Sequence, residues 1–120
     1  MMFETPPTIN QSWKTVSSVE QWKQILEDSK TSTLAIFKHS TRCSRSMFAK
    51  HRLEDGYDIG EEDLTFYYVD LLAHRDVSNA IAEDLGILHQ SPQLIVIKHG
   101  RVVHHSTHES IELHSVKESL

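Results

Sequence analysis

The chain has 120 residues and a formal net charge of −5, with 38% hydrophobic and 24% charged residues. This length allows one domain with its own hydrophobic core, and the composition is that of a globular protein. An acidic chain without a dense basic patch offers little to a polyanion, so we expect no nucleic-acid partner. No apolar run approaches the roughly 18 residues of a membrane span, so we expect no membrane partner.

The N-terminal stretch MMFETPPTINQ is polar and contains one acid and two prolines. It lacks the apolar segment of a signal peptide. The chain holds a single cysteine, Cys43, which excludes an internal disulfide and suits a reducing compartment. We therefore expect a flexible lead-in over residues 1–11, a single domain over residues 12–120 and a cytoplasmic location.

The first predicted elements are a helix over residues 17–29 and a strand over residues 33–38, with room for a short strand near residues 13–16. Ser17 and Glu20 have the spacing of a capping box at the helix start. The run TLAIFK is continuously apolar up to its last residue, which is typical of a strand buried on both faces. The helix residues expected on one buried face are Val19, Trp22, Ile25 and Leu26.

A second helix is predicted after Cys43, because the chain has no glycine or proline up to Gly56. Met47, Phe48 and His51 would lie on one side of it. The acidic, glycine-containing stretch 55–63 then predicts a loop.

The stretch LTFYYVDL, residues 64–71, is rich in β-branched and aromatic residues and predicts the next strand. A helix follows over residues 75–86, with Asp76 as its N-cap and Gly86 at its C-terminal end. The residues expected on its buried face are Val77, Ala80, Ile81 and Leu85.

The run LIVIK, the dipeptide His99–Gly100 and the run RVVHH predict a β-hairpin. Ser110 would cap a last helix, in which Leu113, Val116 and Leu120 recur on one side. Strands separated by helices imply parallel neighbours, and the hairpin adds an antiparallel pair. The sequence thus predicts an α/β fold with a central mixed sheet of about four strands, flanked by helices on both faces.

Cys43 falls between a predicted buried strand and the start of a predicted helix. The free N–H groups and the dipole of a helix N-terminus favour a thiolate over a thiol. Arg42 and Arg45 add positive charge, and the hydroxyl of Ser46 could donate a hydrogen bond to the sulfur. A lone cysteine can equally be a small buried apolar residue. The residues alone leave both interpretations open.

Pro92 directly precedes a predicted strand, where the missing N–H of proline is tolerated. Either isomer of the Ser91–Pro92 bond is compatible with the sequence.

Four stretches together resemble a known family. They are FKHSTRC at residues 37–43 followed by Ser46, DLLAHRDVSNAIAEDLGI at 70–87, HQSPQ at 89–93, and IKHGRVVHHSTHESI at 97–111. Their content and order are similar to those of the thioredoxin fold and, more specifically, of the monothiol, YtxJ-like bacilliredoxins of the bacillithiol system. The resemblance spans most of residues 13–115.

The resemblance implies a role for each residue around the cysteine. Cys43 would be the catalytic cysteine, and Ser46 would stand where two-cysteine relatives carry a resolving thiol. Pro92 would correspond to the cis-proline of the fold, with Ser91 presenting backbone groups to the substrate. Thr41 would also contact the substrate.

The implied activity is removal of bacillithiol from mixed disulfides on client proteins. Bacillithiol, or a dithiol reductant, would regenerate Cys43, with bacillithiol as a thiol co-substrate and no bound cofactor. Bacillithiol carries a malate group with two carboxylates, so Arg42 and Arg45 are candidate contacts for it, with Lys50 as a third. His39 could tune the pKa of the thiol.

One residue departs from the family pattern. Many members have proline directly after the cysteine, whereas this chain has Ser44. Proline at the first helical position pre-organises the helix but has no N–H. Ser44 would therefore restore a donor near the sulfur and give up some rigidity.

Three other functions are compatible with parts of the sequence. The nine histidines, with His104, His105 and His108 close together, raise metal binding, but their spacing is not that of a metal site and we predict none. Some monothiol relatives carry an iron–sulfur cluster between two subunits, but the CGFS-type signature is absent here. A binding module without redox activity would keep Cys43 buried, with an ordinary or raised pKa.

Overall fold

The computed structural model describes residues 13–40 and 42–120, so the lead-in expected over residues 1–11 lies outside the described residues. In chain order the elements are β1 (Lys14–Thr15), α1 (Val19–Asp28), β2 (Thr33–His39), α2 (Ser44–Glu54), β3 (Thr65–Asp70), α3 (Arg75–Leu85), β4 (Gln93–Lys98), β5 (Arg101–Thr107), the 3-10 helix η1 (His108–Ser110) and α4 (Leu113–Glu118). None of these helices is long and apolar enough to span a membrane.

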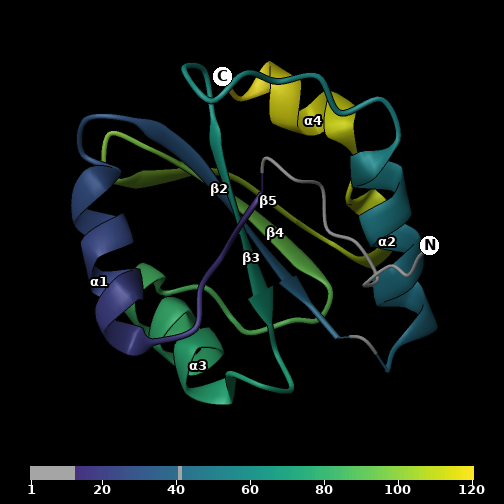
Figure 1. Cartoon of the computed structure of the whole chain (residues 1–120), viewed down its shortest axis with the longest axis horizontal. Coiled ribbons are helices and arrows are strands. Elements are labelled where there is room, and N and C mark those ends of the chain that lie inside the picture. Colours follow the sequence, from purple (N-terminus) through teal and green to yellow (C-terminus); the bar gives the residue numbers. More distant parts are fainter. Residues whose placement is uncertain (1–12, 41) are drawn as a thin grey trace, which may run out of the picture.

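The strands of the described part form one mixed sheet in the order β1-β3-β2-β4-β5. β1, β3 and β2 are parallel, whereas β4 is antiparallel to β2 and to β5. Helices α1 and α3 cover one face, and α2 and α4 cover the other (Figure 1). The predicted α/β fold with a flanked mixed sheet is therefore confirmed. The sheet has five strands because the two-residue β1 pairs with the edge of β3.

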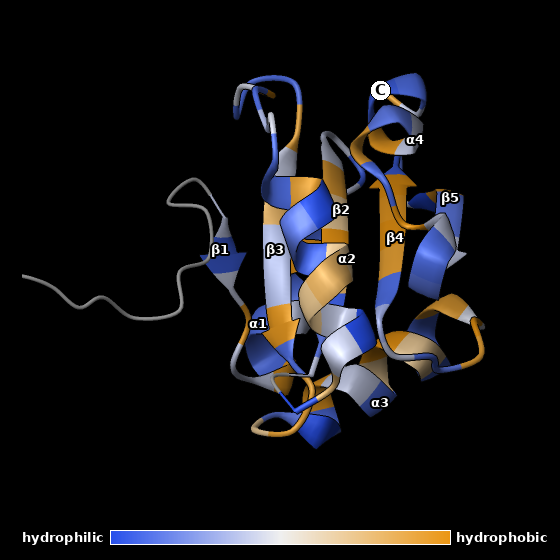
Figure 2. Ribbon diagram, turned by 90° about the vertical axis from the view of Figure 1, so that its right-hand side faces the viewer, coloured by the Kyte–Doolittle hydropathy of each residue, from blue (hydrophilic) through white to orange (hydrophobic). Residues whose placement is uncertain are grey.

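β2 and β4 form the centre of the sheet and are buried on both faces. Successive strand residues point to opposite sides, so Phe37 faces α2 and α4 while Ile36 faces α1 and α3. β4 is hydrophobic along most of its length, whereas the edge strand β5 is largely hydrophilic (Figure 2). In β2, residues 34–39 are all buried, which confirms that the run TLAIFK forms a strand buried on both faces.

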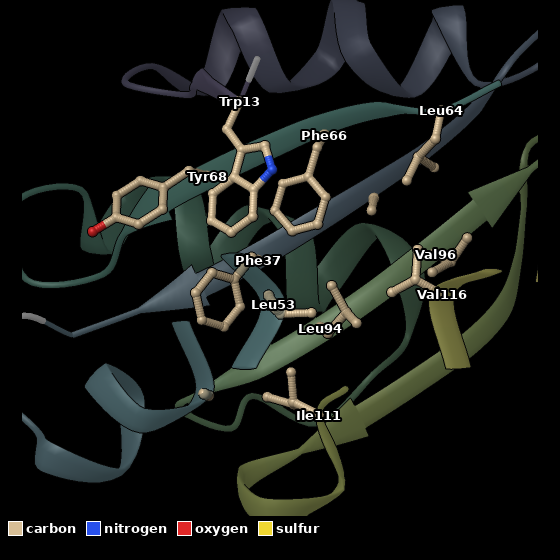
Figure 3. Close-up of a cluster of buried hydrophobic side chains, with 12 residues drawn as sticks. Trp13, Phe37, Leu53, Leu64, Phe66, Tyr68, Leu94, Val96, Ile111 and Val116 are labelled. Carbon is tan, nitrogen blue, oxygen red and sulfur yellow. The ribbon is translucent and has the colours of Figure 1, made fainter. Parts of the chain in front are cut away.

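The core beneath α2 and α4 is built around aromatic side chains (Figure 3). Trp13 stacks on Phe66 with ring centroids 4.1 Å apart, and its edge faces Phe37 at 6.3 Å. Leu53 brings α2 onto this cluster and is fully buried. Complete burial of such a side chain contributes roughly 1.5–3 kcal/mol, so this core fixes α2 against the sheet.

The N-cap of helix α1 lies one residue later than predicted. Ser18 is the N-cap, and its side chain accepts a hydrogen bond from the Gln21 N–H at 3.1 Å. The Gln21 side chain in turn accepts from the Ser17 N–H at 3.0 Å. The expected Ser17–Glu20 capping box is therefore wrong by one residue. The predicted buried face is confirmed, with Trp22 and Ile25 buried and Val19 and Leu26 packed against the same core.

The side of α2 that carries Met47, Phe48 and His51 is not the side that packs on the sheet. Phe48 is 64% exposed, and His51 is also exposed. The helix instead turns four other residues towards the sheet, which are Ser46, Ala49, Lys50 and Leu53. Two of these residues, Ser46 and Lys50, are polar, and burial is tolerated because polar partners are available. The Lys50 amine, for example, pairs with the Glu54 carboxylate at 3.0 Å.

Helix α3 begins at Arg75 as predicted, its predicted N-cap is wrong, and its predicted end at Gly86 is confirmed. His74 is the N-cap, and Asp76 lies in the first turn with its carboxylate accepting from the Val77 N–H. Before the helix, Asp70 accepts from the N–H groups of two following residues and shapes the turn. Gly86 ends the helix in the left-handed conformation, with φ of 66°.

The hairpin forms as predicted, but the last helix starts later. His99 and Gly100 both have positive φ, 54° and 74°, as a type I′ turn requires. Ser110 lies in η1, and the N-cap of α4 is Glu112. Of the residues expected on one side of this helix, Val116 is buried and Leu120 is exposed.

Candidate functional site

Cys43 is the N-cap residue of α2, four residues after the end of β2. Its backbone is extended, with φ of −113° and ψ of 121°, and its carbonyl accepts the first helical hydrogen bond, from the Met47 N–H. The side chain is partly exposed. A buried central strand thus holds the only thiol of the chain at the surface, at the positive end of a helix dipole.

The pKa of Cys43 is lowered by its surroundings. The backbone N–H of Ser46 has the largest effect, and the Arg45 N–H, the Ser46 hydroxyl and the Arg45 charge act in the same direction, against partial desolvation. An N-cap side chain faces the N–H groups of the second and third helical residues, which here are Arg45 and Ser46. The thiol makes no capping hydrogen bond of ordinary length. The same groups nevertheless favour its charged form.

Ser44, the first helical residue, is exposed and is not among the groups that shift the Cys43 pKa. The tuning role expected of Ser44 stays a prediction, since an N-cap side chain accepts from the N–H groups of the second and third helical residues and Ser44 is the first.

Ser46 and Ser40 fix the loop that carries the thiol. Ser46 is fully buried, and its Oγ accepts a hydrogen bond from the Ser40 N–H at 3.3 Å. The Ser40 hydroxyl accepts from the Arg42 N–H at 3.3 Å. The Cys43 N–H donates to the Ser40 carbonyl at 3.3 Å. Thr41, the remaining residue of this loop and a predicted substrate contact, lies outside the described residues.

The Ser91–Pro92 peptide bond is cis, the isomer that the resemblance implied. Lys38 near the end of β2 pairs with Gln93 at the start of β4, so the Pro92 turn leaves the sheet beside the Cys43 loop. Pro92 itself is buried, and its carbonyl accepts from the His108 N–H at 3.2 Å. The Oγ of Ser91 is buried and has no hydrogen-bond partner among the described residues.

The two arginines beside the thiol differ in their contacts. Both are exposed. The Arg45 guanidinium pairs with the Glu109 carboxylate through two hydrogen bonds, of 3.0 Å from Nε and 2.7 Å from Nη2. Glu109 comes from η1, 64 residues further along the chain, and nothing in the local sequence pattern pointed to it. Lys50 does not share this exposed setting, because its side chain is only 6% exposed.

His39 lies under α2 and is 1% exposed. Its ring packs on Phe37 and Tyr68, with centroids 5.6 and 5.4 Å away. Desolvation, followed by the nearby charge of Lys50, lowers its pKa to about 4, so the ring is neutral at neutral pH. His39 is not among the groups that shift the Cys43 pKa.

A buried lysine lies on the other face of the sheet, at a position where the sequence pattern predicted no functional residue. Lys38 is fully buried, and its Nζ donates to the Ser78 carbonyl at 3.0 Å and lies 3.4 Å from Nδ1 of His89. Desolvation lowers its pKa to about 8. The available signal was a lysine at the end of an apolar run. These contacts connect β2, α3 and the segment that leads to Pro92.

The histidine-rich segment does not form a metal site in the described residues. No three histidine, cysteine, aspartate or glutamate side chains within residues 13–40 and 42–120 are grouped as ligands. His104 and His105 instead border a hollow of about 600 Å³, which Gln90, Gln93 and Ser110 also line. Cys43 is not part of its lining, so the thiol does not open into this hollow.

The sheet order, the helices on both faces and the single thiol ahead of α2 define a one-cysteine protein of the thioredoxin fold. A solved structure described as a candidate oxidoreductase with a thioredoxin fold is 27% identical, with a TM-score of 0.72, and the match covers 90% of this chain and 93% of that one. Thioredoxin O2 of Arabidopsis thaliana is 22% identical, with a TM-score of 0.67 and coverage of 91% and 94%. The thioredoxin of Malassezia sympodialis is 19% identical, with a TM-score of 0.67 and coverage of 96% and 93%.

The chain belongs to the monothiol bacilliredoxin BrxC family, whose model matches residues 14–116. Family membership and the single cysteine together indicate a monothiol redox role of the bacilliredoxin type, in which bacillithiol is involved.

Proposed function

We propose that this protein is a monothiol thiol–disulfide oxidoreductase that removes bacillithiol from mixed disulfides on cytoplasmic proteins. The observation that carries the proposal is a partly exposed Cys43 at the N-terminus of α2 with a lowered pKa. Thiolate attack needs an accessible sulfur and a thiolate; the partial exposure of Cys43 supports the first condition, and its lowered pKa favours the second.

In the first step the Cys43 thiolate attacks the bacillithiol sulfur of the mixed disulfide. A new S–S bond forms between Cys43 and bacillithiol as the old S–S bond breaks. The electron pair of the broken bond goes to the client sulfur, which leaves as a thiolate and takes a proton from water. Cys43 is then S-bacillithiolated.

The second step needs a thiol from outside the chain. A two-cysteine relative would release the adduct with its own resolving thiol, but Ser46 has only a hydroxyl. A second bacillithiol thiolate, or one sulfur of a dithiol reductant, attacks the bacillithiol sulfur of the adduct and frees the Cys43 thiolate. With bacillithiol as the reductant, the product is bacillithiol disulfide.

The substrate would lie between the Cys43 loop and the cis-Pro92 turn. These two segments leave the sheet side by side, as the pairing of Lys38 with Gln93 requires. Ser91 would present backbone groups to the substrate, and Thr41 and Arg42 would border it on the cysteine side. Arg42 and Arg45 would contact the malate carboxylates of bacillithiol, since guanidinium groups are suited to pairing with carboxylates.

A binding module without redox activity is less compatible with this site. That alternative expects a buried cysteine with an ordinary or raised pKa. Cys43 is partly exposed and its pKa is lowered.

The test is transfer of the adduct from a bacillithiolated model protein, followed by intact mass spectrometry of both proteins. A glutathionylated copy of the same model protein and a Cys43→Ser variant are the controls. We expect rapid transfer of bacillithiol to the wild-type protein, little transfer of glutathione and no transfer to Cys43→Ser. Equal transfer of both adducts would indicate a general thiol exchanger, and the absence of any adduct would refute the proposal.

A further inference from the structure

The carboxylate of Glu109 forms an ion pair with the guanidinium of Arg45, two residues after Cys43. The two hydrogen bonds of 2.7 and 3.0 Å make this a bidentate pair, the geometry in which arginine binds a carboxylate best. The pairing lowers the pKa of Glu109 to about 2, so its carboxylate is charged throughout the neutral range. The guanidinium that a carboxylate-bearing substrate would bind is therefore already paired with a carboxylate of the protein itself.

The position of Glu109 does not depend on this ion pair. Arg52, two turns along α2, donates from Nε to the Ile111 carbonyl at 2.9 Å and from Nη2 to the His108 carbonyl at 2.7 Å. The His108 N–H is also bound, to the Pro92 carbonyl. These hydrogen bonds to and from backbone groups, which do not involve the Glu109 side chain, fix η1 against α2 and beside the cis-proline. Removal of the Glu109 charge should leave η1 in place.

The charge of Arg45 acts directly on the reactive sulfur, since it contributes to the lowered pKa of Cys43. An approaching anion, however, meets Arg45 together with Glu109, whose charges nearly cancel at a distance. Both side chains are exposed, at 53% and 70%, and exposed ion pairs are weak and exchange readily. A second carboxylate can therefore replace Glu109 on the guanidinium.

We propose that Glu109 is a specificity-determining residue that competes with substrate carboxylates for Arg45. While Glu109 is paired, anionic reagents gain little from Arg45. A substrate whose carboxylate reaches the guanidinium displaces Glu109 and gains the contact. The inference rests on the proposed function for the identity of that carboxylate, the malate group of bacillithiol. The competition itself depends only on Cys43, Arg45 and Glu109.

The test uses two alkylating reagents of nearly the same shape, anionic iodoacetate and neutral iodoacetamide. With each, the Cys43 sulfur forms a bond to the reagent carbon and iodide leaves with the electron pair. The readout is the ratio of the two rate constants, iodoacetate over iodoacetamide, measured by intact mass at neutral pH and low salt. A change in thiolate fraction affects both rates equally and leaves the ratio unchanged.

We expect Glu109→Gln to raise the ratio by about two- to fivefold, the size of effect that exposed charge pairs produce, with less effect in high salt. In an Arg45→Gln background the same substitution should have a smaller effect, because no guanidinium is then released. Asp58→Asn is the matched control. It removes a carboxylate from the exposed Asp58–Lys117 pair beyond the other end of α2, a helix about 16 Å long, and should leave the ratio unchanged.

An unchanged ratio in Glu109→Gln would refute the competition. An equal rise in Asp58→Asn would mean that only net charge matters, and an undiminished effect without Arg45 would mean simple repulsion by Glu109; either result overturns the inference. Alkylation requires neither bacillithiol nor a client protein. A failed transfer assay together with the expected ratio would therefore reject the proposed function and leave the role of Glu109 standing.

Discussion

The side chain of Ser46 joins the loop after β2 to the sulfur of Cys43. Its Oγ accepts a hydrogen bond from the Ser40 N–H at 3.3 Å, and its hydroxyl and backbone N–H both lower the pKa of Cys43. Ser46 thus links the loop before α2 to the thiol and favours the charged form of Cys43.

Replacement of Ser46 by alanine should raise the pKa of Cys43. The variant keeps the Ser46 backbone N–H, which has the largest effect, and loses only the hydroxyl. One hydrogen bond to a charged group is worth roughly 1.5 kcal/mol, so alkylation by iodoacetamide at neutral pH should slow by up to about tenfold. The pH dependence of the alkylation rate checks this. Ser44→Ala, which alters an exposed residue next to Cys43, should keep the wild-type profile.

The buried Lys38 should make the stability of the fold depend on alkaline pH. Its pKa is about 8 in the folded state and near 10.4 in an unfolded chain, so the unfolded state binds more protons between these values. The free energy of unfolding should therefore rise with pH from about 8 to about 10.4, by roughly 3 kcal/mol from this group.

Lys38→Met should lose this rise, and urea unfolding across the alkaline range measures it. Lys30→Met, which removes an exposed lysine, should retain the wild-type slope. A wild-type slope in Lys38→Met would mean that the amine is not the group responsible.

His39 should have a corresponding effect in acid. Its folded-state pKa of about 4 lies below the value of about 6.5 for an unfolded chain, so the unfolded state binds more protons in that window. The free energy of unfolding should fall as the pH falls from 6.5 to 4, by roughly 3 kcal/mol from His39, and no further below pH 4. His39→Phe should flatten this part of the profile, whereas a substitution of the exposed His51 by Gln should not.

Arg52 should be the residue that keeps η1 ordered. Arg52→Met removes two hydrogen bonds to the carbonyls of His108 and Ile111, and we expect a loss of about 1–3 kcal/mol in the free energy of unfolding. Amide hydrogen exchange in residues 108–111 should accelerate more than exchange in β4. Arg101→Met, at an exposed position on β5, provides the comparison and should change stability by less than about 0.5 kcal/mol. Unchanged exchange at residues 108–111 would show that other contacts hold η1.

The strands could be predicted from the sequence because their signals are local. The run 33–38 contains four consecutive apolar residues, 34–37, and the hairpin is marked by its His99–Gly100 turn. The buried face of α2 could not be predicted in this way. Ser46 and Lys50 are polar but buried, because the Ser40 N–H and Glu54 supply partners that the helix pattern does not reveal.

The same distinction applies to the candidate site: the features with local signals could be predicted, and the long-range contacts could not. The position of Cys43 at a helix start follows from the neighbouring strand and helix signals, and the resemblance supplied its pairing with Pro92. The isomer of the Ser91–Pro92 bond leaves no trace in the residue types. The Arg45–Glu109 contact joins residues 64 positions apart, and its partners are ordinary surface charges when read along the chain.

Both free edges of the sheet are poor templates for another chain. β1 has only two residues, and a β-bulge opposite Val96 and Ile97 breaks the register of β5. Short edge strands and bulges are the features by which sheet proteins resist edge-to-edge aggregation. The outer strands β1 and β5 therefore disfavour the stacking of copies of this protein into fibrous assemblies through the edges of their sheets.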